Sequence, residues 1–387
     1  MNTACGILVI GDELLNGAQA DSNSPHMSRF LLPFGFRTKM LQTCGDEIPE
    51  IIEALNRFPK ELGLIITSGG LGNTRDDCTK QALQQWSNLT TFEQINNRVG
   101  RAPGLVLKHQ NHLIVALPGV PHEFLSFMND ELVDLLSQHF NCQSKFAFST
   151  LNVIGLKENE AETLLAEVGK PFNNPRVGLS VKRGHLHIHL LAEAPTTKEV
   201  KTQLSRKEEE ITSLLHPHVF GKNEEGIEHN VAQLLIDKKL SLSVAESCTG
   251  GLISDSLTNI PGASKFFTRG FVTYSVESKI NDLGITKELI DKYGVISEEV
   301  ARSMAENMRR IAQSDYAIAV TGNAGPLTDN NSHIVGLVHM AISSKNTCVH
   351  QKQLFTGNRI DVKLKATKTC FNILREELIK HPFKQHL

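Results

Sequence analysis

The sequence predicts an α/β protein of several domains, because strands and helices alternate in residues 1–145 and again in residues 223–387. Strands that are separated by helices pair in parallel through right-handed crossovers, which gives open sheets. The chain has 387 residues, more than one hydrophobic core usually fills. Residues 146–222 lack this alternation and indicate a small α+β unit between two open-sheet domains.

The first domain is expected to contain four strands and four helices in alternation. Each predicted strand is a short, largely apolar run followed by a turn residue or an acid, and each predicted helix carries apolar residues at helical spacing. The predicted strands are residues 6–11, 36–46, 63–70 and 112–121. The predicted helices are residues 26–35, 47–58, 77–86 and 122–140, the last of them continuous.

The same criteria divide the rest of the chain. In the middle unit the predicted strands are residues 146–155, 177–182 and 185–192, and the predicted helices are residues 158–169 and 197–215. In the last domain the predicted strands are residues 240–246, 266–275, 316–325 and 334–343. The predicted helices there are residues 231–240, 250–260, 297–313 and 362–380.

Composition favours a cytoplasmic protein whose ligands are small and polar. The formal net charge of −2 gives no overall attraction to nucleic acid or anionic lipid, so no direct nucleic-acid binding is expected. No apolar stretch approaches the roughly 18 residues that a membrane span needs. The seven cysteines form no CxxC pair, which argues against a disulfide framework or a structural zinc site.

The stretch TSGGLGNTRDDCT, residues 67–79, is the strongest signal in the first domain. Glycines let backbone N–H groups approach a phosphate, and a following helix start adds favourable potential. Nearby carboxylates suit a divalent cation that bridges phosphate oxygens. The alternative is a glycine-rich turn with an acid at a helix cap. The candidate residues are Gly69, Gly70, Gly72, Asp76, Asp77 and Thr79, with Asp12, Glu13 and Asp46 expected at the same sheet edge.

The stretch HLHIHL places His185, His187 and His189 on one face of a strand. Three histidines on one face are compatible with a metal site. A half-exposed strand explains the pattern as well, because the alternate residues are apolar and supply a core. We favour the half-exposed strand.

The stretch AESCTGG, residues 245–251, admits two interpretations. Ser247 or Thr249 is either a helix cap or, in the case of Ser247, a nucleophile displayed at a strand-to-helix corner. The stretch YSVESK offers Tyr274 and Lys279, and a lysine acts as a base when burial lowers its pKa. The loop TGNAGP, residues 321–326, offers backbone N–H groups to a phosphate or an oxyanion.

With these motifs in view, the chain resembles the competence/damage-inducible protein A (CinA) family nearly end to end. GDELLNG, TSGGLGNTRDDCT, RAPG and LPGVPHEF are similar to the first domain of that family, which is related to the molybdopterin-binding fold. AESCTGG, GFVTYSVESK, GVISEEVA and TGNAGP resemble its C-terminal domain. The resemblance implies a molybdopterin-binding-like domain in residues 1–145, a KH-like linking domain in residues 146–222 and an amidohydrolase domain in residues 223–387.

The resemblance also implies an activity, the hydrolysis of nicotinamide mononucleotide to nicotinate mononucleotide and ammonia, in nicotinamide adenine dinucleotide salvage. By this resemblance Ser247 is the nucleophile, Lys279 activates it, and Tyr274 lies beside the pair. No cofactor is needed for this reaction, and a homodimer is expected. The positions implied to bind the nucleotide are Thr249, Gly250, Thr321, Gly322, Gly325 and Arg359.

Two rival functions stay open. Some relatives are similar to metal-dependent ADP-ribose pyrophosphatases, which would place a divalent cation at Asp46 and Asp77 in the first domain. The third possibility is a binding protein, linked to competence, whose sites have decayed. The family pattern has other residues at Asn73, Val276 and Ser278, and the loop at 327–335 also departs from it.

Overall fold

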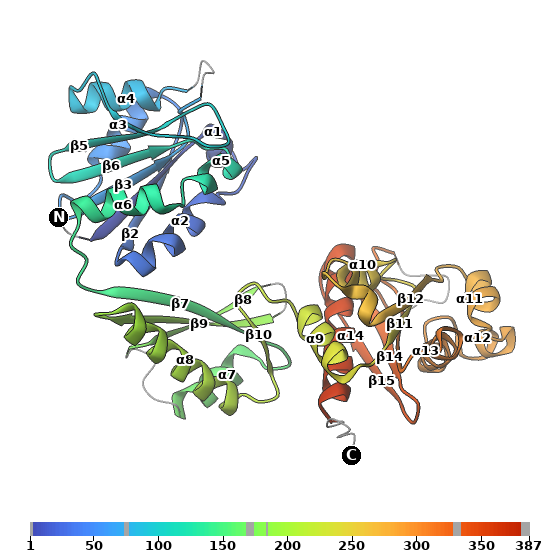
Figure 1. Cartoon of the computed structure of the whole chain (residues 1–387). Helices are drawn as coiled ribbons and strands as arrows, with labels where there is room; N and C mark the ends of the chain where they lie inside the picture. Colours follow the sequence, from blue (N-terminus) through green and yellow to red (C-terminus); the bar gives the residue numbers. More distant parts are fainter. Residues whose placement is uncertain (1–2, 73–76, 168–173, 183–184, 328–333, 381–387) are drawn as a thin grey trace. The chain divides into compact units, whose positions relative to one another are not determined.

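The computed structural model describes residues 3–72, 77–167, 174–182, 185–327 and 334–380. Within them the strands form three sheets, of six, four and five strands (Figure 1). This is the mixed α/β architecture that the sequence predicts. None of the helices in these residues combines the length and the apolar character that a membrane crossing needs.

The first sheet is parallel at its centre and antiparallel at one edge. Its strands are β1 (Ala4–Ile10), β2 (Arg37–Cys44), β3 (Leu64–Ser68), β4 (Glu93–Ile95), β5 (Gly104–His109) and β6 (His112–Leu117), in the order β2-β1-β3-β6-β5-β4. β1 pairs in parallel with β2 and β3, and β3 pairs in parallel with β6. The antiparallel β5–β6 hairpin was not predicted. Only two residues separate these strands, too few for a parallel crossover.

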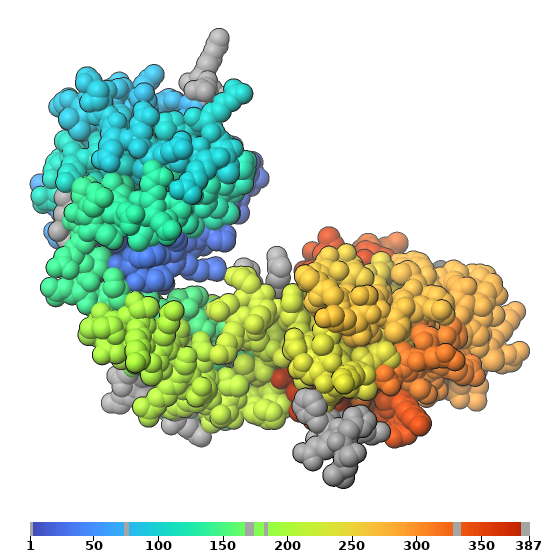
Figure 2. Space-filling view, in the orientation of Figure 1, coloured from blue at the N-terminus to red at the C-terminus, as the bar shows by residue number. Residues whose placement is uncertain are grey.

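Helices cover both faces of this sheet, as Figure 1 shows, and Figure 2 shows the same domain in space-filling form at the blue end of the colour scale. The side chains of Leu8 and Ile10 in β1 pack with those of α3 (Ile48–Asn56) and α4 (Thr79–Ser87) in one core. The alternate residues Ile7 and Val9 pack in a second core. That core includes α2 (Asn23–Leu31), α5 (Pro121–Ser126) and α6 (Asp130–His139). The two short helices of this domain are α1 (Asp12–Leu15) and η1 (Leu32–Phe34).

The single helix predicted over 122–140 is wrong, because the structure divides it into α5 and α6. Asn129 begins the second helix as its N-cap, and its Oδ1 accepts a hydrogen bond from the Leu132 N–H at 3.2 Å. Phe127, in the break, is fully buried. An Asn-Asp pair inside an apolar pattern is a helix start signal, which outweighs the continuity of the apolar spacing.

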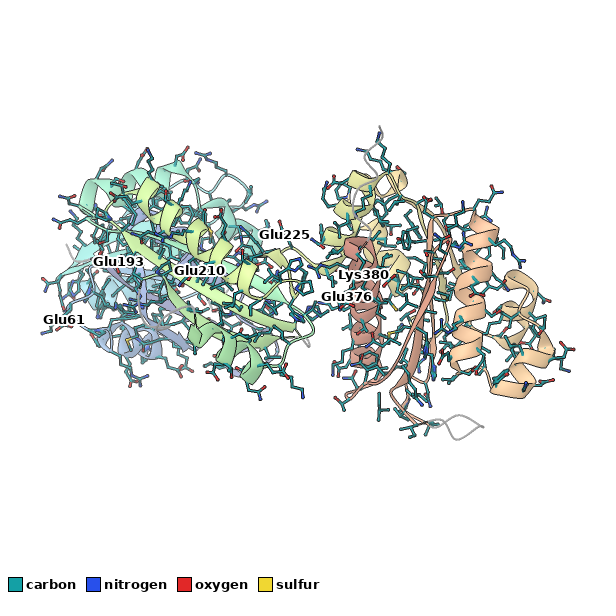
Figure 3. All side chains as sticks on the ribbon, turned by 90° about the horizontal axis from the view of Figure 1, so that it is seen from below. Glu61, Glu193, Glu210, Glu225, Glu376 and Lys380 are labelled. Carbon is teal, nitrogen blue, oxygen red and sulfur yellow. The ribbon has the colours of Figure 1, made fainter. Side chains whose placement is uncertain are left out.

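The second sheet has four strands. They are β7 (Lys145–Val153), β8 (Arg176–Lys182), β9 (His185–Ala194) and β10 (Val219–Lys222), in the order β10-β7-β9-β8. Its helices are α7 (Glu158–Glu167) and α8 (Thr197–Leu214). Glu225, labelled in Figure 3, follows β10, and its carbonyl accepts a hydrogen bond from Asn152 Nδ2 at 2.9 Å. The short strand β10 was not predicted.

The third sheet lies between two layers of helices, as Figure 3 shows. Its strands are β11 (Leu242–Glu246), β12 (Phe267–Val272), β13 (Tyr316–Gly322), β14 (Leu337–Ser343) and β15 (Cys348–Leu354), in the order β12-β11-β13-β14-β15. The helices are α9 (Ile227–Lys238), α10 (Leu252–Thr258), η2 (Ala263–Lys265), α11 (Val276–Leu283), α12 (Lys287–Tyr293), α13 (Glu298–Ala312) and α14 (Arg359–Lys380). β11 pairs in parallel with both neighbours, so the carboxyl ends of β11, β12 and β13 share one edge.

Candidate active site

Ser247 lies directly after β11, in the first turn of the crossover to α10. Its backbone N–H donates to the Val320 carbonyl at 3.0 Å, and its carbonyl accepts from the Gly250 N–H at 3.0 Å. Gly250 and Gly251 have φ angles of 62° and 97°, which side chains disfavour. The two glycines therefore let the chain turn back sharply enough to present Ser247 at the edge of the sheet.

Lys279 contacts Ser247 directly. Its Nζ lies 3.0 Å from Ser247 Oγ and donates to the Thr273 carbonyl at 2.7 Å. The lysine side chain is 1% exposed, and this burial lowers its pKa to about 8. A lysine with such a pKa has a substantial neutral fraction near neutral pH and can accept a proton from a hydroxyl. The contact joins two crossovers of the sheet, since Lys279 belongs to α11.

Glu246, the last residue of β11, supports the turn that carries Ser247. One carboxylate oxygen accepts hydrogen bonds from Thr249 Oγ1 at 2.7 Å, the Gly251 N–H at 3.0 Å and the Ile253 N–H at 3.1 Å. The other accepts from the N–H and the hydroxyl of Ser254, at 2.9 and 2.7 Å. The carboxylate thus satisfies the free N–H groups at the start of α10.

This arrangement corrects one interpretation of the sequence. Neither Ser247 nor Thr249 caps α10 with its side chain, because Gly251 is the N-cap residue and the Glu246 carboxylate binds the N–H groups. Glu246 was not predicted as a site residue. The signal was present, since Glu246 is the one charged residue in the strand LSVAE, directly before the helix.

Arg359 and Tyr274 form the second part of the site. Arg359 donates to Tyr274 Oη at 2.6 Å through one guanidinium nitrogen and to the Gly325 carbonyl through the other. Tyr274 is 58% exposed, so this pair lies at the surface, whereas Ser247 and Lys279 are buried. Three segments that are far apart in sequence, those of Tyr274, Gly325 and Arg359, therefore meet at one point.

The remaining predicted binding residues support the backbone of the loops. Thr321 is buried, and its hydroxyl donates to the Val295 carbonyl at 2.9 Å. Gly322 admits no side chain, because a β-carbon there would lie 2.6 Å from the Leu337 carbonyl oxygen. Thr249 is buried against Glu246. Nucleotide binding by these residues stays a prediction, and residues 328–333 of the divergent loop lie outside the described part of the chain.

The glycine turn of the first domain also forms at the carboxyl end of a strand. Gly69 and Gly70, with φ angles of 118° and 66°, follow β3, and Thr79 Oγ1 donates to the Gly69 carbonyl at 2.9 Å. Asn23, which was not predicted, donates from its amide to Ser68 Oγ at 2.9 Å and to the Gly119 carbonyl at 2.7 Å. These bonds fix the shape of the turn.

The acids near this turn are only partly brought together. Asp46 Oδ2 accepts a hydrogen bond from the Asp12 N–H at 3.0 Å, and Asp77 lies over Gly72, 2.5 Å from where a β-carbon would stand. Asp76 lies outside the described residues. Within the described residues no group of three His, Cys, Asp or Glu side chains is arranged to hold a metal ion. Metal binding at Asp46 and Asp77 stays a prediction.

The three histidines of β9 make hydrogen bonds and ring contacts within the protein. His187 Nδ1 lies 2.9 Å from Asn152 Oδ1, and the two ring nitrogens of His189 lie 3.0 and 2.7 Å from hydroxyls of Thr150 and Ser180. His185 is buried and packs edge-on against Phe220. The alternate residues Leu186, Ile188 and Leu190 are buried as the half-exposed strand predicts, but of the three histidines only His187 and His189 are partly exposed.

A hollow of about 630 Å³ at the opposite end of the third sheet holds none of the predicted site residues. It is lined by the last turns of α13 and by the β14–β15 turn, including Arg309, Ser343 and Lys345. No contact between a nucleophile and a base is found among its described lining residues. The predicted site residues of this domain therefore lie at the Ser247 edge and not in this hollow.

The fold and the site define a three-domain α/β protein whose last domain buries a serine–lysine pair. Three family models match the chain in succession: a probable molybdopterin binding domain over residues 6–138, the damage-inducible protein CinA KH domain over 149–221, and the CinA C-terminal domain over 224–378. Whole-length relatives agree. The chain is 33% identical over 416 residues to a CinA-like protein of Amoebophilus asiaticus, covering 96% of this chain and 98% of the relative.

A protein of Alkaliphilus oremlandii named as competence-damage inducible is 32% identical over 408 residues, covering 96% of this chain and 98% of the relative. The chain belongs to the competence-damage inducible protein (CinA) family. Among solved structures, a CinA superfamily protein of Klebsiella pneumoniae is 30% identical, with a TM-score of 0.39, covering 40% of this chain and 97% of that one. A competence/damage-inducible protein of Agrobacterium tumefaciens is 34% identical, with a TM-score of 0.38 and the same coverage.

Proposed function

We propose that this protein is an amide hydrolase that converts nicotinamide mononucleotide and water to nicotinate mononucleotide and ammonia. The observation that carries the proposal is the 3.0 Å contact between Lys279 Nζ and Ser247 Oγ, with Ser247 8% exposed and Lys279 1% exposed. A buried nucleophile in contact with a base of lowered pKa is the arrangement that acyl transfer requires.

The first half of the reaction forms an ester on Ser247. Neutral Lys279 accepts the hydroxyl proton as Ser247 Oγ bonds to the amide carbon. The C–N bond then breaks, and ammonia leaves with the proton that Lys279 returns. In the second half, water gives a proton to Lys279 and attacks the ester carbon, the bond to Ser247 Oγ breaks, and Lys279 returns the proton to Ser247 Oγ as the carboxylic acid leaves. The Thr273 carbonyl, 2.7 Å from Lys279 Nζ, keeps the amine directed at the serine in both halves.

The nucleotide part of the substrate is supported by the resemblance and by Arg359. Its guanidinium bridges Tyr274 and the Gly325 loop at the surface of the same domain. A guanidinium at this place suits a phosphate, which it binds with paired N–H groups.

The test is ammonia release from nicotinamide mononucleotide by the full-length protein and by Ser247→Ala. The wild type is expected to release ammonia, and Ser247→Ala to lose at least about 1,000-fold of the rate with an unchanged melting temperature. Full activity in a folded Ser247→Ala variant would exclude the ester route. A wild type that binds the nucleotide without releasing ammonia would instead identify a binding protein with a decayed site.

A second candidate function is hydrolysis of ADP-ribose by the first domain with a divalent cation. It is favoured by the acids at the sheet edge, where a β-carbon on Gly45 would lie 2.6 Å from carboxylate oxygens of both Asp12 and Glu50, beside Asp46. This activity is expected to disappear with a chelator and in Asp77→Asn, and to persist in Ser247→Ala. Hydrolysis that a chelator does not affect would count against it.

A further inference from the structure

Lys363, in the first turns of α14, is a cation that has no role in the reaction proposed above. Its side chain is partly buried, and the structure gives its ammonium no hydrogen-bond or ion-pair partner among the described residues. A β-carbon placed on Gly250 would lie 3.5 Å from Lys363 Nζ. The ammonium therefore lies beside the turn that carries Ser247, within van der Waals distance of where a β-carbon at 250 would stand.

Lys363 follows Arg359 by four residues, so both side chains leave the same face of α14. Arg359 contacts the Gly325 loop and Tyr274, and Lys363 Nζ lies near Gly250. Arg359 and Lys363 thus place two positive charges beside the Gly325 loop and the Gly250 turn, at one edge of the sheet. Lys365 on the same helix behaves differently, because its ammonium donates to the Thr356 carbonyl at 2.6 Å.

We propose that Lys363 and Arg359 together form the subsite for a terminal phosphate monoester, and that Lys363 makes the site selective for mononucleotides. This inference rests on the proposed function of the Ser247 site. A phosphate monoester carries close to two negative charges at neutral pH, and it matches two cations better than the single charge of a phosphate diester. A bound anion also stabilises a partly buried ammonium without a partner more than it stabilises an ammonium that is already paired.

The inference predicts an order of substrates. Nicotinamide mononucleotide, with a terminal phosphate, is bound well. Nicotinamide riboside, which lacks the phosphate, and the dinucleotide, whose phosphates are internal, are bound poorly. The selectivity is expressed in KM rather than in kcat, because Lys363 does not contact the Ser247–Lys279 pair.

The kinetic test compares Lys363→Met with Lys365→Met as a matched control on the same helix. Lys363→Met is expected to raise KM for nicotinamide mononucleotide about 10- to 100-fold, the usual effect of one hydrogen bond to a charged group, with kcat changed less than about threefold. KM for the riboside is expected to stay unchanged, and Lys363→Arg to restore binding of the mononucleotide. An unchanged KM in Lys363→Met, or an equal rise for the riboside, would overturn the inference.

A binding test separates this inference from the amidohydrolase proposal. Ribose 5-phosphate carries the same terminal phosphate but no amide, so its binding to the full-length protein does not depend on catalysis. Titration calorimetry is expected to show binding to the wild type and to Lys365→Met, and binding about 10-fold weaker or more to Lys363→Met. Equal binding to all three proteins, or none to the wild type, would overturn the subsite, whatever the ammonia assay shows.

Discussion

The first and last domains of this chain both form a turn at the end of a parallel strand, but they differ in which side chains the turn brings together. Both place a glycine-containing turn at the carboxyl end of a parallel strand, after β3 in the first domain and after β11 in the last. In the last domain the proposed nucleophile and base are already in contact, with Lys279 Nζ 3.0 Å from Ser247 Oγ. In the first domain the turn is formed, but among the described residues the acids do not gather into a set of three metal ligands.

The difference shows what a strand edge supplies by itself. Parallel strands bring their following loops together, which explains why Asp12 meets Asp46 and why Ser247 lies near β13. Contact between a nucleophile and a base needs more than a shared strand edge. It also needs a second helix or strand that places the base beside the nucleophile in the protein interior. In the last domain α11 does this, because Ser275 caps the helix and Lys279 enters one turn later.

The largest expected effect comes from removing the base. Lys279→Met is expected to lower ammonia release by about 100- to 10,000-fold, the usual contribution of a general base. Lys279→Arg should be equally inactive, because a guanidinium does not give up its proton. The pKa of Lys279 is lower in the folded than in the unfolded chain, so the buried amine lowers the free energy of unfolding at pH 7. Lys279→Met should therefore unfold at no lower urea concentration than the wild type.

The next effect is the pH dependence of the rate. Only the neutral amine of Lys279 accepts the serine proton, and burial lowers its pKa to about 8. The rate of ammonia release is therefore expected to rise about tenfold per pH unit below pH 8 and to level off above it. A rate that is flat from pH 6 to pH 9 would contradict the role of Lys279. ADP-ribose hydrolysis by the first domain should lack this dependence.

A smaller effect compares the supports of the two turns. Glu246→Ala removes an acceptor of five hydrogen bonds and should lower the free energy of unfolding by about 3 kcal/mol or more. Thr79→Val removes the single bond to the Gly69 carbonyl and should cost about 1 kcal/mol. Urea unfolding followed by circular dichroism measures both. Equal effects would show that the Ser247 turn does not depend on its carboxylate.

Much of this architecture follows from the sequence. Apolar runs and turn residues predict the parallel strands, and the edge rule predicts that the loops bearing Ser247 and Gly325 share one side of the sheet. The β4–β5 and β14–β15 pairings and helices α11 and α12 were missed, because these segments are short or half-exposed and carry weak periodicity.

How deeply a side chain is buried could not be predicted from the sequence. Lys279 lies in YSVESK, which has the composition of a surface segment, and only the packing of α11 against the sheet buries it. Lys363 belongs to a helix with several lysines, and nothing in their order singles it out. Asn23 was not singled out in the sequence, although it bonds to Ser68, 45 residues away. Such contacts depend on tertiary structure.

The most direct test of the serine–lysine account is to trap the ester. Full-length protein is mixed with nicotinamide mononucleotide, quenched in acid within the first turnover and examined by peptide mass spectrometry. We predict that the peptide containing Ser247 carries the acyl group of nicotinate mononucleotide, and that the adduct is absent from Ser247→Ala. Ammonia released in the first turnover with no adduct on that peptide, or with the adduct on another residue, would contradict the account.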